Sequence, residues 1–250
     1  MTVERGEVLV NRLGDPLRVL VVGASSGIGA STAQSLADSG ARVVGAARRA
    51  TRVAELEAVT AVACDVTLPE DCDRAVDTAV ETLGGLDALV YAAGATQLTP
   101  LDSTGLDRWT ELFGINVFGA AMVTRAALPH LLSESSDNRA VYLSSDSLEK
   151  PYPGMVAYAA SKAGLRAFCL GLANEFASLR VTEIMVGPTI DTEAGNHFDP
   201  NALGDWFTRW TDEGYIRFGY QLAVDVAAVV LETLRSKEPD SRVTAAAEPT

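Results

Sequence analysis

The sequence predicts an α/β protein built on a doubly wound parallel β-sheet of about seven strands, with helices on both faces. Three observations carry this prediction. Short apolar runs recur along the 250 residues, long Ala- and Leu-rich segments lie between them, and a glycine-rich turn follows the first run. Continuous apolar strands are typical of a sheet that is buried on both faces, and strand–helix alternation favours parallel pairing.

The candidate strands are seven apolar runs. In chain order they are RVLVVGA (18–24), ARVVGAA (41–47), VTAVACDV (59–66), DALVYAAG (87–94), RAVYLSS (139–145), VTEIMVG (181–187) and a weaker SRVTAAA (241–247). Helices are expected above all over 106–132 and 155–178. No linker rich in Pro, Gly or Ser divides the chain, so we expect a single domain over 1–250, with 1–17 as a short N-terminal extension.

Charge and targeting signals narrow the function class. The net charge of −13 argues against a nucleic-acid partner, because a phosphate backbone needs a basic surface. The N-terminus carries Glu4 and Glu7 and has no long apolar core, and the apolar run LAVDVAAVVLETL near the end is too short to span a bilayer. We therefore expect a cytoplasmic protein that has no membrane partner and acts on a small molecule.

The three cysteines, Cys64, Cys72 and Cys169, have no metal-ligand spacing. They form an odd set, which suits free thiols in a reducing compartment. We expect no metal site.

A glycine-rich turn, GASSGIGA, lies between the first strand and the first helix. Gly23, Gly27 and Gly29 permit a tight turn and a close approach of the backbone to a pyrophosphate, which the N–H groups of the helix N-terminus attract. The spacing is G-x-x-x-G-x-G rather than G-x-G-x-x-G. This placement indicates dinucleotide binding; the alternative is a purely structural turn.

A second signal is AYAASKAGL, in which Tyr158 and Lys162 lie four residues apart in an expected helix. Residues at this spacing share one helix face, so a phenol and an ammonium point into the same space. Taken alone, the pair is also compatible with a tyrosine that packs and a lysine that reaches solvent.

Taken together and in order, these motifs resemble those of the short-chain dehydrogenase/reductase family over nearly the whole chain from about Arg18. The motifs are the glycine turn, Asp65 after the third strand, YAAG after the fourth, Asn116 in a long helix, Ser145 after the fifth strand, Tyr158 and Lys162. The resemblance implies a Rossmann fold. It also implies that Ser145, Tyr158 and Lys162 are catalytic and that Asn116 holds a water in a proton relay.

Physical chemistry supports these roles. Hydride transfer at a carbonyl carbon requires a proton to move at the oxygen, and a free phenol with a pKa of about 10 is a poor base at neutral pH. A lysine charge roughly 5 Å away at an effective dielectric of about 20 contributes on the order of 3 kcal/mol, which would lower the tyrosine pKa by about two units. Ser145 would orient the substrate oxygen; its neighbour Ser144 is the local alternative.

By the same resemblance the cofactor contacts extend over the strand ends. Asp65 would hydrogen-bond the adenine amino group, although a strand-end carboxylate can also serve as a local cap. The implied cofactor-binding residues are Gly23, Ser25, Ser26, Gly27, Ile28, Gly29, Asp65, Val66, Ala93, Gly94, Tyr158, Lys162, Pro188 and Thr189. Three stretches depart from the family pattern: Val22, the Tyr91–Ala92 pair within YAAG, and GPTIDT at 187–192.

Cofactor choice depends on VVGAARRA, where the second strand ends. An enzyme that selects NAD commonly places an acidic residue there, but Ala47 occupies the matching position, with no acid nearby in sequence. Arg48 and Arg49 follow, and a guanidinium suits a 2′-phosphate. We expect NADP(H), with Arg48 as the main contact and Arg49 assisting; the alternative is a solvated basic loop.

The remaining expectations concern the substrate and the assembly. An aromatic-rich segment at about 190–220 is the expected substrate-binding lid, although subunit or core packing explains its aromatic residues equally well. The two long helices around Asn116 and Tyr158 resemble those that build dimers and tetramers in the family, so we expect a homo-oligomer, with a tetramer favoured over a dimer. No motif in the sequence assigns His130 or His197 to a catalytic or ligand-binding role.

The sequence thus predicts an NADP(H)-dependent oxidoreductase acting on a ketone, aldehyde or secondary alcohol, with Tyr158 as general acid/base. The alternative is a catalytically weak NADP(H)-binding sensor or scaffold of the same fold.

Overall fold

All seven expected strands are present and form one parallel sheet. The computed structural model describes residues 8–133, 136–195, 198, 200–237 and 241–247. The strands are β1 (Arg18–Val22), β2 (Arg42–Ala47), β3 (Val59–Ala63), β4 (Ala88–Tyr91), β5 (Arg139–Leu143), β6 (Arg180–Val186) and β7 (Arg242–Ala245). Their order is β3-β2-β1-β4-β5-β6-β7, and each neighbouring pair is parallel. The predicted doubly wound α/β fold is confirmed.

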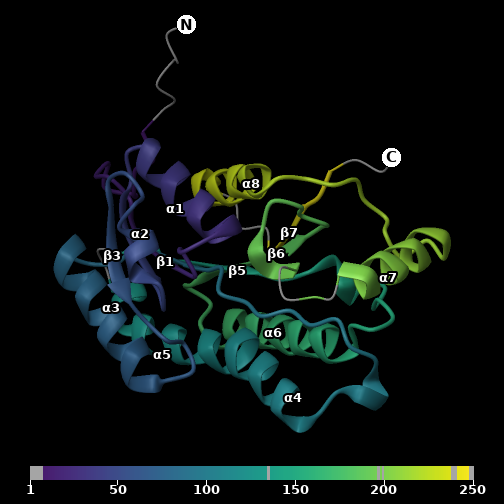
Figure 1. The fold of residues 1–250 in the computed structure, drawn as a ribbon. Coiled ribbons are helices and arrows are strands. Elements are labelled where there is room, and N and C mark those ends of the chain that lie inside the picture. Colours follow the sequence, from purple (N-terminus) through teal and green to yellow (C-terminus); the bar gives the residue numbers. More distant parts are fainter. Residues whose placement is uncertain (1–7, 134–135, 196–197, 199, 238–240, 248–250) are drawn as a thin grey trace, which may run out of the picture.

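The helices lie in two layers, one on each face of the sheet (Figure 1). They are α1 (Gly27–Asp38), α2 (Ala50–Val53), α3 (Pro69–Leu83), α4 (Leu106–Phe113), α5 (Ala120–Leu131), α6 (Val156–Glu175), α7 (Pro200–Asp212) and α8 (Ala223–Arg235). Helices α1 and α8 cover one face, whereas α3, α4, α5 and α6 cover the other. Helix α7 lies at the end of the molecule near β6 and β7.

Two hydrophobic cores follow from the pleat of the central strands. In β1, Leu20 and Val22 pack into the core beneath α3, α5 and α6, whereas Val19 and Val21 pack into the core beneath α1 and α8. Successive side chains of a strand point to opposite faces, so a strand buried on both faces must be apolar throughout. This is why the sequence shows continuous apolar runs.

The long helix expected over 106–132 is interrupted. Helix α4 passes into a π-helical segment, Gly114–Gly119, and then into α5. Over Leu106–Leu131 this run is long and apolar enough to cross a membrane by length and composition, with a mean hydropathy of 1.3 in its 18-residue window. It carries the fully buried Asn116 and contributes Val123 and Ala127 to the core, so it is a packed helix of this domain.

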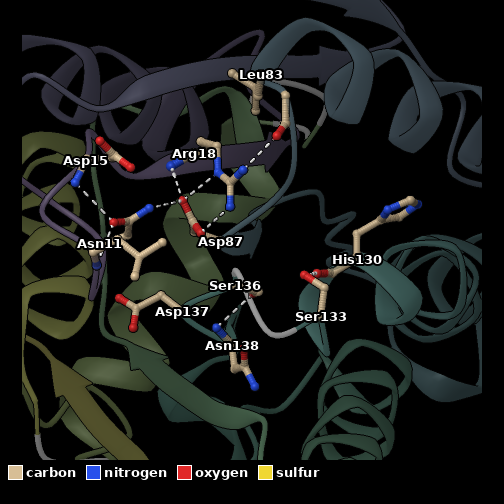
Figure 2. Close-up of polar contacts among 12 residues, drawn as sticks. Asn11, Asp15, Arg18, Leu83, Asp87, His130, Ser133, Ser136, Asp137 and Asn138 are labelled. Carbon is tan, nitrogen blue, oxygen red and sulfur yellow. Dashed lines mark hydrogen bonds and ion pairs between the residues drawn. The ribbon is translucent and has the colours of Figure 1, made fainter.

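The described part of the N-terminal extension is attached to the amino edge of the sheet. Val10 and Pro16 form an antiparallel bridge, and Leu9 and Leu17 are buried. Figure 2 shows the Asp87 carboxylate between Arg18 and Asn11. Arg18 donates from Nε and Nη2 at 2.9 and 2.8 Å, and the Asn11 amide donates at 3.3 Å. A buried ion pair thus joins the starts of β1 and β4, and the Asn11 amide attaches the extension to it.

The strand order places the candidate site. Between β1 and β4 the direction of winding reverses, so the loops that follow these two strands diverge at the carboxyl edge. Ligands of open α/β sheets bind in the crevice that such a switch point creates. The glycine turn follows β1, and YAAG ends β4, so both motifs meet there.

Candidate active site

The glycine turn is packed so closely against its neighbours that two of its glycines admit no side chain. Gly23 has a φ of +93°, and a Cβ there would lie 2.5 Å from the backbone nitrogen of Ala93. A Cβ on Gly29 would lie 2.2 Å from the carbonyl oxygen of Gly23. The turn therefore presents bare backbone at the N-terminus of α1, as a bound pyrophosphate requires.

Ser145, Tyr158 and Lys162 meet at the carboxyl edge, as predicted. Ser145 follows β5, while Tyr158 and Lys162 lie on one face of α6. The Ser145 side chain acts on the Tyr158 hydroxyl, where it lowers the pKa against the effect of burial, and the Lys162 ammonium lies 5.9 Å from the centroid of the Tyr158 ring. The Ser145 hydroxyl also donates to Ser147 Oγ at 2.9 Å and accepts from the Ser147 N–H at 3.2 Å.

Ser144, the local alternative, lies elsewhere. Its Oγ is buried, and among the described residues it has no hydrogen-bond partner, while its backbone N–H donates to the carbonyl oxygen of Ile184 at 2.8 Å. Ser145 is therefore the serine that faces Tyr158.

The expected lowering of the Tyr158 pKa by Lys162 is wrong for this structure. Burial raises the pKa of Tyr158 to about 12, and the hydrogen bond from Ser145 offsets only part of that rise. Burial also lowers the pKa of Lys162 to about 8. The Lys162 ammonium donates to the carbonyl oxygen of Leu143 at 2.9 Å, so it is held by the end of β5. Desolvation by burial is the largest cause of both pKa shifts.

Asn116 is fully buried in the π-helical segment, where its side chain connects three parts of the site. Its Oδ1 accepts from the backbone N–H of Ala95 at 2.8 Å, and its Nδ2 donates to the Ala95 carbonyl at 2.9 Å and to Ser161 Oγ at 2.8 Å. A Cβ on Gly94 would lie 3.4 Å from Asn116 Oδ1 and 3.5 Å from Lys162 Nζ. Both amide protons are used by the protein, so the Asn116 side chain positions the loop after β4 against α6.

Tyr91 occupies a position where the family pattern has asparagine, and it supplies its own link to this segment. Its hydroxyl donates to the carbonyl oxygen of Ile115 at 2.6 Å, within the π-helical segment. The next residue, Ala92, donates from its N–H to the Val22 carbonyl at 2.8 Å. The central strand is thus tied to its neighbours without the usual asparagine pair.

One carboxylate at the site was not selected from the sequence. Asp146 directly follows Ser145 and is buried, with Oδ2 accepting from the Tyr152 hydroxyl at 2.8 Å and Oδ1 lying 3.4 Å from Ser145 Oγ. Burial raises the pKa of Asp146 above its ordinary value, although the hydrogen bond from Tyr152 and the nearby Arg217 oppose the rise. The only signal in the sequence was an acid beside the candidate serine.

At the end of β2 the structure separates the two arginines. Both arginines are exposed, but the Arg49 guanidinium reaches the glycine turn and donates to Ser26 Oγ at 3.1 Å and Ser25 Oγ at 3.4 Å. It also pairs with Glu193 at 2.6 Å. The sequence shows no acid near Ala47, but the loop after β6 brings the Glu193 carboxylate to Arg49, two residues further along the chain.

The other expected cofactor residues occupy the same edge. Asp65 Oδ1 accepts from the N–H and the hydroxyl of Thr67 at 3.0 and 2.7 Å, which matches the local-cap alternative. Asp65 Oδ2 takes no part in these two hydrogen bonds. Val66 is buried beneath Gly119, and Ile28 packs against the core beneath α1 and α8.

In the stretch GPTIDT the residue that reaches the glycine turn differs from those expected. The Thr189 hydroxyl donates to the Gly187 carbonyl at 3.0 Å, and the Pro188 carbonyl accepts from the Gln221 N–H. Thr192, which was not selected, lies against the turn: a Cβ on Gly27 would be 3.2 Å from the Thr192 Cβ. The sequence signal was a hydroxyl five residues after Gly187.

The aromatic residues of the expected lid mostly pack against the segment before α6. Trp210 donates from its indole N–H to the Pro153 carbonyl at 2.9 Å, and its ring lies 5.2 Å from the ring of Tyr152. The Trp206 ring lies against Gly154. These contacts explain part of the aromatic content by packing, and the lid itself stays a prediction. His130 lies at the end of α5 away from this edge, and His197 lies outside the described residues.

Comparison with known proteins gives the family. The model of the short chain dehydrogenase family matches residues 18–201. A putative ketoacyl reductase of the granaticin polyketide synthase from Streptomyces violaceoruber is 38% identical over 194 residues, which is 73% of this chain and 78% of that protein. A short chain dehydrogenase from Burkholderia cenocepacia, solved in complex with NADP, is 31% identical with a TM-score of 0.77, over 91% of this chain and 95% of that one.

A further structure, a short-chain dehydrogenase from Streptomyces avermitilis, is 27% identical with a TM-score of 0.78, over 92% of this chain and 88% of that one. The chain belongs to the short-chain dehydrogenases, and the predicted family is confirmed. It is an oxidoreductase of that family, whose members bind a nicotinamide cofactor and act on small molecules.

Proposed function

We propose that this protein is an NADP(H)-dependent oxidoreductase that interconverts a ketone or aldehyde with the corresponding alcohol, with Tyr158 as the general acid/base. The observation that carries the proposal is the convergence of Ser145, Tyr158 and Lys162 beside the glycine turn. When bound, the nicotinamide supplies or accepts the hydride. The bare backbone of Gly23 and Gly29 and the N-terminus of α1 would hold its pyrophosphate.

The residues of the site divide the proton chemistry between them. In the reductive direction the Tyr158 hydroxyl donates its proton to the carbonyl oxygen of the substrate, while Ser145 donates a hydrogen bond to the same oxygen and stabilises its developing charge. Lys162 holds its ammonium at the end of β5, beside the ribose position. Because burial raises the pKa of Tyr158 to about 12, the hydroxyl is protonated at neutral pH, which suits a proton donor.

The experiment is a screen of carbonyl compounds for substrate-dependent loss of NADPH absorbance, with Tyr158→Phe as the matched control. Turnover of at least one carbonyl compound by the wild type, and its loss in the variant, supports the enzyme. NADPH binding with no turnover across ketones, aldehydes and ketoacyl thioesters supports the alternative, a sensor or scaffold of the same fold. The similarity to a putative ketoacyl reductase makes β-ketoacyl thioesters the first compounds to test.

For the 2′-phosphate of NADP(H), the geometry favours Arg49 over Arg48. Arg49 contacts both serines of the glycine turn, whereas no such contact is found for Arg48 among the described residues. A charged hydrogen bond is worth about 1.5–3 kcal/mol, so Arg49→Ala is expected to weaken NADPH binding by about ten- to a hundredfold. NADH binding should change far less in the same variant.

Calorimetric titration of both cofactors into wild type, Arg48→Ala and Arg49→Ala checks this prediction. A larger loss in Arg48→Ala than in Arg49→Ala would restore the order that the sequence suggested. Tighter binding of NADH than of NADPH by the wild type would refute the cofactor preference itself.

We also propose a homo-oligomer that uses the outer faces of α4, α5 and α6. Leu106 on α4, Phe118 in the π-helical segment before α5 and Leu170 on α6 are 81%, 59% and 54% exposed, and short-chain dehydrogenases commonly oligomerise. Burial of such side chains between two copies is favourable. Sedimentation velocity at micromolar concentration is expected to show a dimer or tetramer that Phe118→Asp weakens; a wild-type monomer would contradict the proposal.

A further inference from the structure

Glu193 joins two arginines at the place where the 2′-phosphate is expected. Its Oε2 accepts from Arg49 Nη2 at 2.6 Å, and its Oε1 accepts from Arg52 Nη1. Arg49 follows β2, Arg52 lies in α2, and Glu193 comes from the loop after β6. The same Arg49 nitrogen lies 3.1 Å from Ser26 Oγ, so the carboxylate is held at the mouth of the glycine turn.

The loop that carries Glu193 lies over this turn. We call residues 189–195 the strap. At its start, Ile190 donates from its N–H to the Gln221 carbonyl at 3.1 Å, and Asp191 Oδ1 accepts from the N–H of Ala223 at 2.6 Å, at the N-terminus of α8. Thr192 then contacts Gly27. The strap is therefore fixed to α8 at one end and to the arginines through Glu193 at the other.

We infer that Glu193 is an internal competitor of the cofactor's 2′-phosphate for Arg49 and Arg52, and that it sets how strongly the enzyme prefers NADP(H). The inference rests on the proposed NADP(H)-dependent function. A carboxylate and a phosphate monoester offer the same paired oxygens to a guanidinium, but the phosphate carries more charge, about −1.5 to −2. NADP(H) thus displaces Glu193 and releases the strap, whereas NAD(H) has no group that can do so.

Two consequences follow for residues of this chain. Arg52, which the sequence did not single out, is a second ligand of the 2′-phosphate once Glu193 leaves. Glu193 remains ionised at neutral pH, because hydrogen bonds from Arg49 and then Arg52 hold its pKa at about 2. The competition is therefore present at neutral pH, and each bound NADP(H) must break both pairs.

The test is the binding of both cofactors to Glu193→Gln, which keeps the shape of the side chain and removes its charge. Exposed ion pairs are individually weak, so loss of two is expected to tighten NADPH binding by about two- to thirtyfold. NADH binding should not tighten, because a ribose hydroxyl gains nothing from the freed arginines. The matched control is Glu111→Gln, which removes an exposed pair with Arg108 on α4.

Calorimetric titration separates the outcomes. Tighter NADPH binding in Glu193→Gln alone, lost again when Arg52→Ala is added, supports the competition. Unchanged or weaker NADPH binding overturns it, and so does an equal gain for NADH, which would mean that the strap merely hinders access to the turn. If Arg49→Ala leaves NADPH binding of the wild type unchanged, the proposed cofactor site itself fails; if it weakens that binding while Glu193→Gln has no effect, only the competition fails.

Discussion

At the amino edge of the sheet the buried Asp87 carboxylate accepts from the side chain and backbone of Arg18 and from Asn11, whereas at the carboxyl edge the buried Lys162 ammonium is held by the Leu143 carbonyl. Burial would raise the pKa of Asp87, but its hydrogen bonds with Arg18 outweigh this and hold the pKa below its ordinary value. Burial of Lys162, by contrast, lowers its pKa to about 8.

The difference separates groups that support the fold from groups that are available for chemistry. In the Arg18–Asp87 pair at the amino edge the charged forms are favoured, because each charge has its partner within the protein. At the carboxyl edge burial disfavours the charged forms of Asp146, Tyr158 and Lys162, and pKa values perturbed in this way are characteristic of sites that bind and transform a ligand. Substitutions at each edge test this difference between the two groups.

The largest effect is expected for Tyr158→Phe at the carboxyl edge. Loss of the hydroxyl removes the proton donor, so turnover should fall by about a thousandfold. The melting temperature and the NADPH affinity should stay close to those of the wild type, because the ring and its packing remain. Initial rates, thermal unfolding and cofactor titration are the three measurements, and turnover retained in the variant would remove Tyr158 from its proposed role.

The converse effect is expected for Asp87→Asn at the amino edge. The substitution leaves the Arg18 guanidinium without its counter-charge, and we expect a loss of about 2–4 kcal/mol in the free energy of unfolding. The cofactor affinity of the folded protein should be unchanged. Urea unfolding measures the loss, with Asp73→Asn as the control, because that residue forms an exposed pair with Arg125 and should cost less than about 1 kcal/mol.

The pH dependence of this loss has a defined sign. Since the folded pKa of Asp87 lies below its unfolded value of about 3.9, its contribution is fully present above that value and disappears as pH falls through the folded pKa. The difference between wild type and Asp87→Asn should therefore be constant near pH 7 and shrink in acid. A difference that grows in acid would contradict the ion-pair assignment.

The two edges also differ in how far the sequence could predict them. At the carboxyl edge, the glycine turn, Ser145, Tyr158 and Lys162 were predictable because each follows a strand or shares a helix face, and parallel strands bring their carboxyl ends together. The Arg49–Glu193 pair could not be predicted, because its residues are 144 positions apart and Glu193 lies in a loop without regular periodicity. The order of Arg48 and Arg49 could not be read either, since side-chain direction at a strand end depends on the turn that follows.

The Arg18–Asp87–Asn11 cluster at the amino edge was also beyond the sequence pattern. Asp87 precedes an apolar strand, where an acid is as compatible with a surface turn as with a buried ion pair. The electrostatics of the catalytic groups were misjudged for a related reason. Helical spacing fixes the separation of Tyr158 and Lys162, but the desolvation that raises one pKa and lowers the other depends on the elements packed around them.

The smallest expected effect is a change in the pH profile of Asp146→Asn. The Asp146 carboxylate contributes to raising the pKa of Tyr158, after burial and alongside the opposing hydrogen bond from Ser145. An asparagine keeps an acceptor for the Tyr152 hydroxyl but removes the charge, so the pKa of Tyr158 should fall by less than about one unit. In the direction of alcohol oxidation, which needs the deprotonated phenol, the rising limb of log kcat/KM should move to lower pH.

Tyr152→Phe serves as the control, because it removes only the hydroxyl that bonds Asp146 and leaves the carboxylate charge in place. A limb that stays fixed or moves to higher pH in Asp146→Asn would show that this carboxylate does not act on Tyr158.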